Sequence, residues 1–252
     1  LKFYYKTPRA VDRTQYALAS GFAEILSTQL AIHELEVQKE LTARAEVRAL
    51  QAQINPHFLF NTLNTIASFT RTDPLRAREL LREFSSFYRA TLDNSGSLIP
   101  VSREVAQTKR YLTFEKARFG EDRVLATFDV SEDVEDTLVP AFVIQPIVEN
   151  AVRHGMGDGD ALQIDVTVHQ DGDDAILIAV ADNGVGMDEA TIASAMTYDP
   201  DSILVSRSIG LRIINARVKL LFGEKYGLSI ESRVGEGCRV TLCIPKRGNE
   251  HA

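Results

Sequence analysis

"VADNGVGM", residues 180–187, places an acid and two glycines directly after an apolar run that is typical of a strand. A carboxylate at a strand end, here Asp182, can accept a hydrogen bond from an exocyclic amine such as that of adenine. Gly184 and Gly186 permit positive φ angles and a close approach of the backbone to a flat ligand. The pattern predicts a nucleotide-base site, although a plain glycine-rich turn that reverses the chain has the same composition.

A helix predicted over residues 142–155 lies upstream and ends in the polar cluster "VENAVRHG". Asn150 and Arg153 are three residues apart and therefore share a face. An amide oxygen is a hard ligand that can hold Mg²⁺, and a nearby cation can meet phosphate. Glu149 and His154 belong to the same cluster. The alternative is an ordinary polar helix end beside a glycine.

Two further glycine motifs follow downstream. "SIGLRIINARV" puts Gly210 and Leu211 at the start of a predicted helix, where backbone N–H groups can bind an anion. "GEGCRVTL" places Gly235 and Gly237 before the last strand. Both motifs are also common as ordinary turns.

Strands are predicted over residues 124–130, 163–169, 175–182, 228–232 and 239–245. Strands interleaved with helices predict a layered sheet with helices on one face.

The order of these four motifs resembles the ATP-binding domain of GHKL type, which histidine kinases share with gyrase-type ATPases, Hsp90-type chaperones and MutL. The resemblance covers roughly residues 121–246 and implies a Bergerat-type α/β sandwich with ATP and Mg²⁺ as cofactors. It implies Asn150 as the Mg²⁺ ligand, Asp182 as the adenine-binding residue, and a mobile ATP lid between Met187 and Ser208. Further nucleotide contacts are implied for Arg153, His154, Gly184, Gly186, Gly210 and Leu211.

The sequence departs from this family in two places, the end of the ATP lid and the helix that carries Asn150. Ser206 and Ser208 stand where glycines are common, which puts nucleotide affinity or lid closure in question. Gyrase-type ATPases carry a water-activating glutamate four residues before the asparagine, and here that position is Pro146. The chain is therefore expected to be better suited to phosphoryl transfer than to hydrolysis of ATP by water.

"AQINPHFLFNTLNTI", residues 52–66, contains a candidate phosphoryl acceptor. The stretch is typical of a helix, yet Pro56 would remove the helix bond to Ala52 and bend the chain there. His57 follows it directly. A neutral imidazole nitrogen is nucleophilic, and phosphoryl transfer to it needs mainly positioning and charge stabilisation. An isolated histidine is more often a satisfied helix residue, but an ATP module downstream favours His57 as the acceptor.

That string closely resembles the phosphoacceptor box of sensor histidine kinases of the LytS/YehU type, and the resemblance spans about residues 45–246. It implies a two-component sensor that phosphorylates His57 from Mg-ATP and passes the phosphoryl group to an aspartate of a response regulator, one with a LytTR-type DNA-binding domain. Phe58 stands where many histidine kinases have an acid. Asn61, one turn on, is predicted to orient the ring, and Glu149 is a candidate base.

The first half of the chain reads as helices with short connections, which favours an antiparallel hairpin. The second helix is predicted to start at Asp73-Pro74, and the third to run from an N-cap at Ser102 to Phe119. Together with the resemblance, these helices imply a dimerising helical hairpin, which forms a four-helix bundle in the homodimer, followed by the α/β sandwich.

Four segments are predicted along the chain. Residues 1–32 are the end of a GAF-like sensor domain with a signalling helix, and residues 33–120 serve dimerisation and phosphotransfer. Residues 121–247 form the ATP-binding domain, and residues 248–252 are a tail.

Composition narrows the classes of partner. The net charge of −7 argues against direct nucleic-acid binding, and no apolar run is long enough to cross a membrane. Cys238 and Cys243 lie five residues apart in a strand and should point to opposite faces, so we do not expect a disulfide between them. Free cysteines fit a reducing, cytosolic compartment. We expect the cytoplasmic portion of a membrane-anchored bacterial sensor whose membrane segments are absent from this chain. The alternatives to a histidine kinase are a catalytically weak scaffold or regulator phosphatase, and an ATP-driven clamp.

Overall fold

The computed structural model describes residues 56–93, 98–156, 161–196 and 209–246, together with residues 20, 27 and 29. The chain divides into two compact units, Leu1–Asn55 and Pro56–Ala252. The predicted sensor-domain remnant, the helix bond from Pro56 to Ala52, and Ser206 and Ser208 of the lid lie outside the described residues. The predicted domain boundaries likewise stay predictions.

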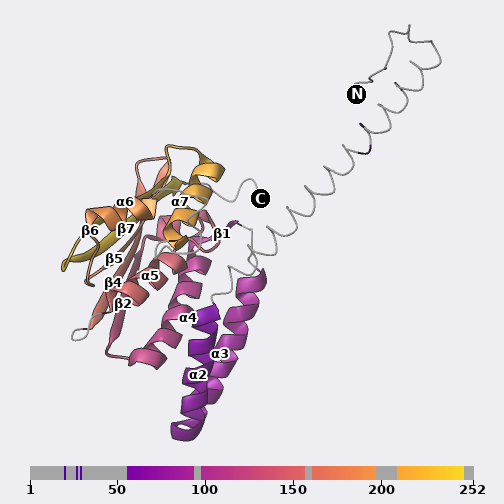
Figure 1. The fold of residues 1–252 in the computed structure, drawn as a ribbon, viewed down its shortest axis with the longest axis vertical. Helices are drawn as coiled ribbons and strands as arrows, with labels where there is room; N and C mark the ends of the chain where they lie inside the picture. Colours follow the sequence, from indigo (N-terminus) through magenta and orange to yellow (C-terminus); the bar gives the residue numbers. More distant parts are fainter. Residues whose placement is uncertain are drawn as a thin grey trace, which may run out of the picture. The chain divides into compact units, whose positions relative to one another are not determined.

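Helices fill the first part of the second unit and recur through the rest of it (Figure 1). The helices are α2 (Pro56–Thr72), α3 (Pro74–Asp93), α4 (Val101–Phe119), α5 (Gln145–Gly155), α6 (Glu189–Met196) and α7 (Ile209–Phe222), with a 3-10 turn η1 (Glu132–Val134). A single residue, Asp73, connects α2 to α3, and its Oδ1 accepts the N–H of Arg76 at 3.1 Å. So short a link makes the two helices an antiparallel hairpin, as the sequence predicts.

An aromatic cluster joins this hairpin to α4. The Phe58 ring of α2 lies 5.1 Å from the Tyr111 ring of α4, centroid to centroid, and 5.7 Å from the Phe87 ring of α3. Phe84 and Phe114 complete the cluster with centroid distances of 5.8 Å or less. Edge-to-face rings at such distances add to the free energy of burial. The cluster fixes α2 and α3 against α4, the helix that leads into the sheet domain.

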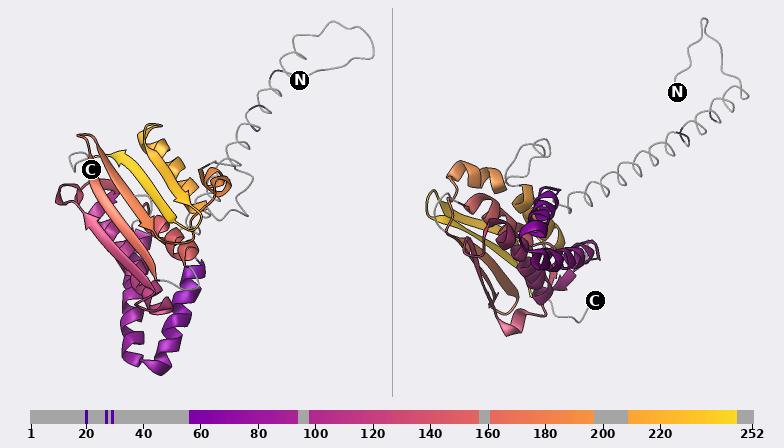
Figure 2. Two further views of the ribbon diagram at one scale, coloured as in Figure 1. Left: turned by 90° about the vertical axis from the view of Figure 1, so that its left-hand side faces the viewer. Right: turned by 90° about the horizontal axis from the view of Figure 1, so that it is seen from below.

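A five-stranded mixed sheet forms the second part, in the order β2-β4-β5-β7-β6. The pair β2·β4 is parallel and the other pairs are antiparallel. Its strands are β2 (Val124–Val130), β4 (Leu162–Asp171), β5 (Ala175–Asp182), β6 (Gly227–Arg233) and β7 (Gly237–Pro245). Figure 2 shows the helices gathered on one face of the sheet. The fold class is thus confirmed for one chain: a helical hairpin followed by an α/β ATPase-type domain. The four-helix bundle of a dimer stays a prediction.

The sequence analysis did not predict several short elements. Strands β1 (Leu98–Pro100) and β3 (Leu138–Pro140) pair antiparallel, and α6 occupies part of the stretch expected to be the lid. Ser102 is not the N-cap of α4, because the helix begins at Val101 after Pro100. The N–H groups of Val101 and Ser102 instead donate to backbone carbonyls beside β3, each at 3.0 Å. These partners are more than thirty residues away, so local sequence does not reveal them.

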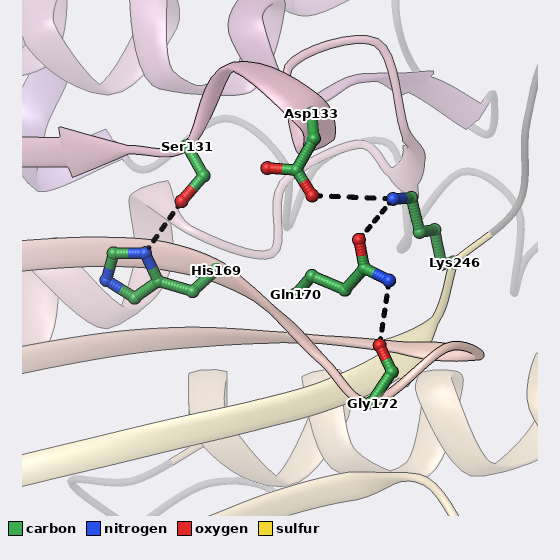
Figure 3. Close-up of polar contacts among 6 residues, drawn as sticks. All are labelled: Ser131, Asp133, His169, Gln170, Gly172 and Lys246. Atoms are coloured by element: carbon green, nitrogen blue, oxygen red, sulfur yellow. Dashed lines mark hydrogen bonds and ion pairs between the residues drawn. The ribbon is translucent and has the colours of Figure 1, made fainter.

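Polar contacts fasten the end of β7 to β4 and η1 (Figure 3). Lys246 donates to Asp133 and Gln170, while Ser131 Oγ lies 2.9 Å from His169 Nδ1. His169 pairs with Leu177 of β5, at the opposite end of the strand from Asp182. Among the residues that the structure describes, no helix has both the length and the apolar character needed to cross a bilayer.

Candidate functional site

A cavity of ≈ 310 Å³ lies on the helix-covered side of the sheet. It is lined by residues of α5, β5, the loop after β5, α6, the start of α7, the turn between β6 and β7, and β7. Its wall is largely apolar, with Val180, Leu211 and Val240 among the lining residues, while Asn150 and Asp182 bring polar groups. A concave apolar pocket with a few convergent polar groups is the usual form of a small-molecule site.

One face of α5 supplies the polar groups of the helix side. Asn150 and His154 both line the cavity, because residues four apart share a helix face. Glu149 and Arg153 do not line it. Glu149 Oε1 accepts a hydrogen bond from Gln145 Nε2 at 2.9 Å, and the exposed Arg153 donates from Nε to His154 Nε2 at 3.2 Å. Arg153, which was predicted to share a face with Asn150, thus does not line the cavity, and its role in binding stays a prediction.

The Asn150 amide fits a ligand-binding role. Its Nδ2 atom is buried and has no hydrogen-bond partner among the described residues. A buried amide without a partner costs about 1–3 kcal/mol. Gly210 at the start of α7 faces this amide, since a Cβ there would lie 3.5 Å from Nδ2. A rotated amide would present Oδ1 to Mg²⁺, an ion that takes one or two protein oxygens and completes its shell with phosphates and water.

Asp182 ends β5 opposite Cys238 of β7. Its Oδ1 accepts the N–H of Gly184 at 2.9 Å. Burial raises the pKa of the Asp182 carboxyl, and the N–H groups of Gly184 and Cys238 offset part of that rise. The next residue, Asn183, anchors the loop to β4 by accepting the N–H of Gln163 at 2.8 Å. The carboxylate is thus held in place, half-buried, in the wall of the cavity.

The loop after β5 is fastened to the β6–β7 hairpin. Gly186 has a φ of 68°, and a Cβ atom at this position would collide with the carbonyl oxygen of Arg233. The N–H of Met187 donates to Ser232 Oγ at 2.8 Å. Only glycine combines this backbone conformation with so close an approach. The predicted positive φ at Gly186 is therefore observed, but the backbone here closely approaches the β6–β7 hairpin instead of a flat ligand.

His57 lies on α2 with its side chain exposed. The Nδ2 atom of Asn61, one turn on, lies 3.2 Å from both ring nitrogens. Phe58 points the other way and is buried in the aromatic cluster. The residue that replaces the usual acid is therefore a packing residue, and it leaves the histidine ring facing outward with an amide beside it.

Two family models match most of the described chain. Residues 45–124 match the model "Histidine kinase", and residues 135–248 match "Histidine kinase-, DNA gyrase B-, and HSP90-like ATPase". The second match contains every cavity residue named above, and the first contains His57 and Asn61. The chain belongs to the histidine kinase family.

Relatives of this histidine kinase chain include sensors from several bacteria. Sensor protein LytS of Bacillus anthracis is 39% identical over 99% of this chain and 42% of that protein. Sensor protein LytS of Bacillus subtilis (strain 168) is 37% identical over 100% of this chain and 43% of that protein. Sensor histidine kinase YpdA of Escherichia coli (strain K12) is 36% identical over 98% of this chain and 42% of that protein. The chain spans less than half the length of these relatives.

The structure brings together part of the predicted site of this histidine kinase. Asn150, His154, Asp182, Gly186 and Leu211 line one cavity. The other predicted nucleotide contacts, Arg153, Gly184 and Gly210, lie beside it without lining it. Their roles, and those of His57, Asn61 and Glu149, stay predictions.

The sequence analysis did not predict the cavity residues at the start of α6 or those of the β6–β7 hairpin. Asp188 and Thr191 line the cavity, and Asp188 Oδ1 accepts the Thr191 N–H at 2.8 Å as a helix cap. An aspartate three residues before the capped N–H is a usual helix-start signal, so "MDEAT" could have revealed α6. Val234, in the turn between β6 and β7, and Cys238 also line the cavity, and Cys238 comes there because β7 pairs with β5 and sets it opposite Asp182.

Proposed function

We propose that the chain is the catalytic part of a two-component sensor histidine kinase. In this proposal it binds Mg-ATP in the cavity between α5, β5 and α7 and phosphorylates His57. The phosphoryl group then passes to an aspartate of a response regulator, of LytTR type by family resemblance.

One observation supports this function above the alternatives. The compact unit that holds the cavity also holds an exposed histidine whose ring contacts a neighbouring amide. A gyrase-type clamp ATPase carries its water-activating glutamate four residues before the asparagine, and this chain has Pro146 at that position. Phosphoryl transfer needs an acceptor nucleophile and positioning, and His57 supplies the nucleophile.

The residues have separable tasks in this proposal. Asp182 accepts the exocyclic amine of the base, and the apolar wall at Val180 and Val240 covers its ring. Asn150 holds Mg²⁺ through its amide oxygen, and the metal neutralises phosphate charge when it is bound. A ring nitrogen of His57 forms a bond to the γ-phosphorus as the bond to the β-phosphate oxygen breaks. The ring then loses its proton, for which Glu149 is the proposed base.

Partners and location follow from the same proposal. Phe60 and Leu63 of α2 and Leu81 of α3 are exposed on the hairpin, with 64%, 41% and 50% of their surface accessible. Exposed apolar residues on two neighbouring helices suit a second hairpin, which supports a homodimeric four-helix bundle. The relatives named above are sensors, so we place this chain on the cytoplasmic side of a membrane-anchored protein.

Incubation with γ-labelled Mg-ATP tests the proposal. The wild-type chain should acquire label that is acid-labile and base-stable, as expected for phosphohistidine. Asn150→Ala should abolish labelling through loss of Mg-ATP binding. Nucleotide turnover without any label on the protein would instead favour a clamp ATPase.

His169→Ala is a matched control for His57→Ala. Both histidines are exposed, but His169 contacts Ser131 near the end of β4 that is remote from Asp182. His57→Ala should lose the label while still binding ATP, and His169→Ala should keep it. Equal labelling of His57→Ala and the wild type would exclude His57 as the acceptor.

A further inference from the structure

Glu104 of α4 is a fully buried carboxylate that binds the start of another helix. Its Oε1 accepts the backbone N–H groups of Val143 at 2.8 Å, Ile144 at 3.0 Å and Gln145 at 3.5 Å. Its Oε2 accepts the N–H of Phe142 at 3.1 Å. Four successive N–H groups, those that precede and begin α5, therefore converge on one side chain that is 0% exposed.

The sequence explains why α5 needs this acid. A helix start leaves N–H groups without partners, and its N-cap residue usually supplies one through a short polar side chain. The N-cap of α5 is Ile144, which has no such group, and no side chain of its own turn caps the helix. An anion at a helix N-terminus also interacts favourably with the helix dipole. Glu104, forty residues away, takes both roles.

The turn before α5 is shaped for an anion. Phe142 has a φ of 61°, a left-handed conformation that residues other than glycine seldom adopt. Such turns direct successive N–H groups inward and form an anion-binding nest. Strained backbone of this kind persists only where the surroundings hold it, and it gathers at functional sites. Here the group in the nest is the carboxyl of Glu104; burial raises its pKa, and the four N–H groups offset part of that rise.

Arg217 ties a third helix to the same turn. Its Nη1 donates to the carbonyl oxygen of Ala141 at 2.6 Å. Burial lowers the pKa of this guanidinium, and the charge of Glu104 opposes that shift. Arg217 lies on α7, the helix that carries Gly210 against the Asn150 amide and Leu211 in the cavity wall. The turn over residues 141–144 therefore joins α4, α5 and α7.

We infer that Glu104 is a positioning residue for the nucleotide site. It sets the place of Asn150 by fixing the start of α5, and through α4 it connects the nucleotide site to the helical hairpin. The link runs along α4, since Tyr111, seven residues after Glu104, packs on Phe58 beside His57. Catalysis is sensitive to displacements of about 1 Å, which can cost on the order of a hundredfold in rate. The catalytic arm of the test below rests on the proposed function.

Glu104→Gln tests this inference. The amide keeps the size of the side chain but replaces one acceptor oxygen by a donor, which cannot bind a backbone N–H. We expect a folded chain whose labelling rate at saturating ATP falls roughly tenfold or more. The Mg²⁺ concentration needed for half-maximal ATP binding, measured by calorimetry, should rise by a similar factor. A purely structural role would change thermal stability and leave this Mg²⁺ dependence unaltered.

Thr108→Val is the matched control. Thr108 is fully buried on α4 one turn after Glu104, and its hydroxyl donates to the Glu104 backbone carbonyl at 2.9 Å. Its substitution should lower stability without altering the rate or the Mg²⁺ dependence. If Glu104→Gln unfolds, Glu104→Asp decides the question, because it keeps the carboxylate but shortens its reach to the N–H groups that begin α5. It should weaken Mg-ATP binding several-fold.

The outcomes separate this inference from the proposed function. A wild-type chain that binds ATP but takes no label contradicts the proposed function, while calorimetry still measures the Mg²⁺ dependence. A folded Glu104→Gln chain with the rate and Mg²⁺ dependence of the wild type overturns the inference alone. Unaltered Mg-ATP binding in a folded Glu104→Asp chain would overturn it in the same way.

Discussion

Gly184, in the loop after β5, packs directly against the backbone of Gly155, the last residue of α5. A Cβ atom on Gly184 would lie 2.7 Å from the Gly155 carbonyl oxygen and closer still to its Cα. The loop that follows Asp182 and the helix that carries Asn150 therefore meet without a side chain between them. This contact sets the spacing of two polar groups that line the same cavity.

Gly184→Ala should push these two elements apart. Overpacking of this kind costs about 1–3 kcal/mol, and the shift of Asp182 relative to Asn150 should weaken ATP binding as well. Urea unfolding and calorimetry with ATP measure both effects. Gly172→Asn is the control, because Gly172 has open space around it and a φ of 62° that asparagine tolerates. Similar losses in both variants would show that the contact is not the cause.

Asp182→Asn should stabilise the chain without nucleotide and abolish ATP binding. Burial raises the pKa of this carboxyl above 3.8, so the folded state favours the neutral form. The favourable contribution of the group is complete at low pH and is lost as the pH rises through the raised pKa. At neutral pH the neutral amide avoids that loss. Calorimetric melting without ATP should show a higher Tm for the variant at neutral pH and a smaller difference in acid. A lower Tm at neutral pH would contradict this account.

Phe58→Ala should destabilise the second unit strongly. The ring is 6% exposed and packs on Tyr111, Phe87 and Phe114. Removal of a buried phenylalanine ring costs about 3–5 kcal/mol. Leu75→Ala on α3 is the control, since that side chain is 75% exposed. Denaturant unfolding should separate the two variants clearly, and a loss under about 1 kcal/mol for Phe58→Ala would mean that the cluster does not hold the hairpin.

Asn61→Ala should slow labelling without weakening nucleotide binding. The amide lies 3.2 Å from the His57 ring, and one hydrogen bond that orients a nucleophile is worth roughly tenfold in rate. Asn64→Ala, an exposed amide further along α2, should leave the rate unchanged. Single-turnover labelling at saturating ATP, with the Kd for ATP measured in parallel, distinguishes the two. A tenfold loss of affinity in Asn61→Ala would assign this residue to binding instead.

The sheet and its glycine turns could be predicted because their signals are local. Strands β2 and β5 have the predicted bounds, and the hairpin turn at Gly172 follows the Asp171-Gly172 signal. Cys238 and Cys243 are both free, as predicted. Elements held by distant partners were missed. Helix α5 starts at Gln145 instead of residue 142, because Glu104 holds the preceding N–H groups in a turn.

Helix periodicity did not select the cavity residues of α5. It grouped Asn150 with Arg153, whereas Asn150 and His154 line the cavity and Arg153 does not. The contribution of α6 and the role of Glu104 depend on contacts between elements far apart in the sequence. No pattern within one helix distinguishes an acid that caps another helix from an ordinary surface acid.

Location of the phosphoryl group on the protein is the most direct test of the central claim. The wild-type chain is incubated with Mg-ATP, digested at alkaline pH to preserve phosphohistidine, and its peptides are sequenced by mass spectrometry. The account predicts one phosphorylated peptide, the one that contains "NPHFLFN", with the modification on His57. Phosphate on another residue, or none on a chain that binds and turns over ATP, would contradict it.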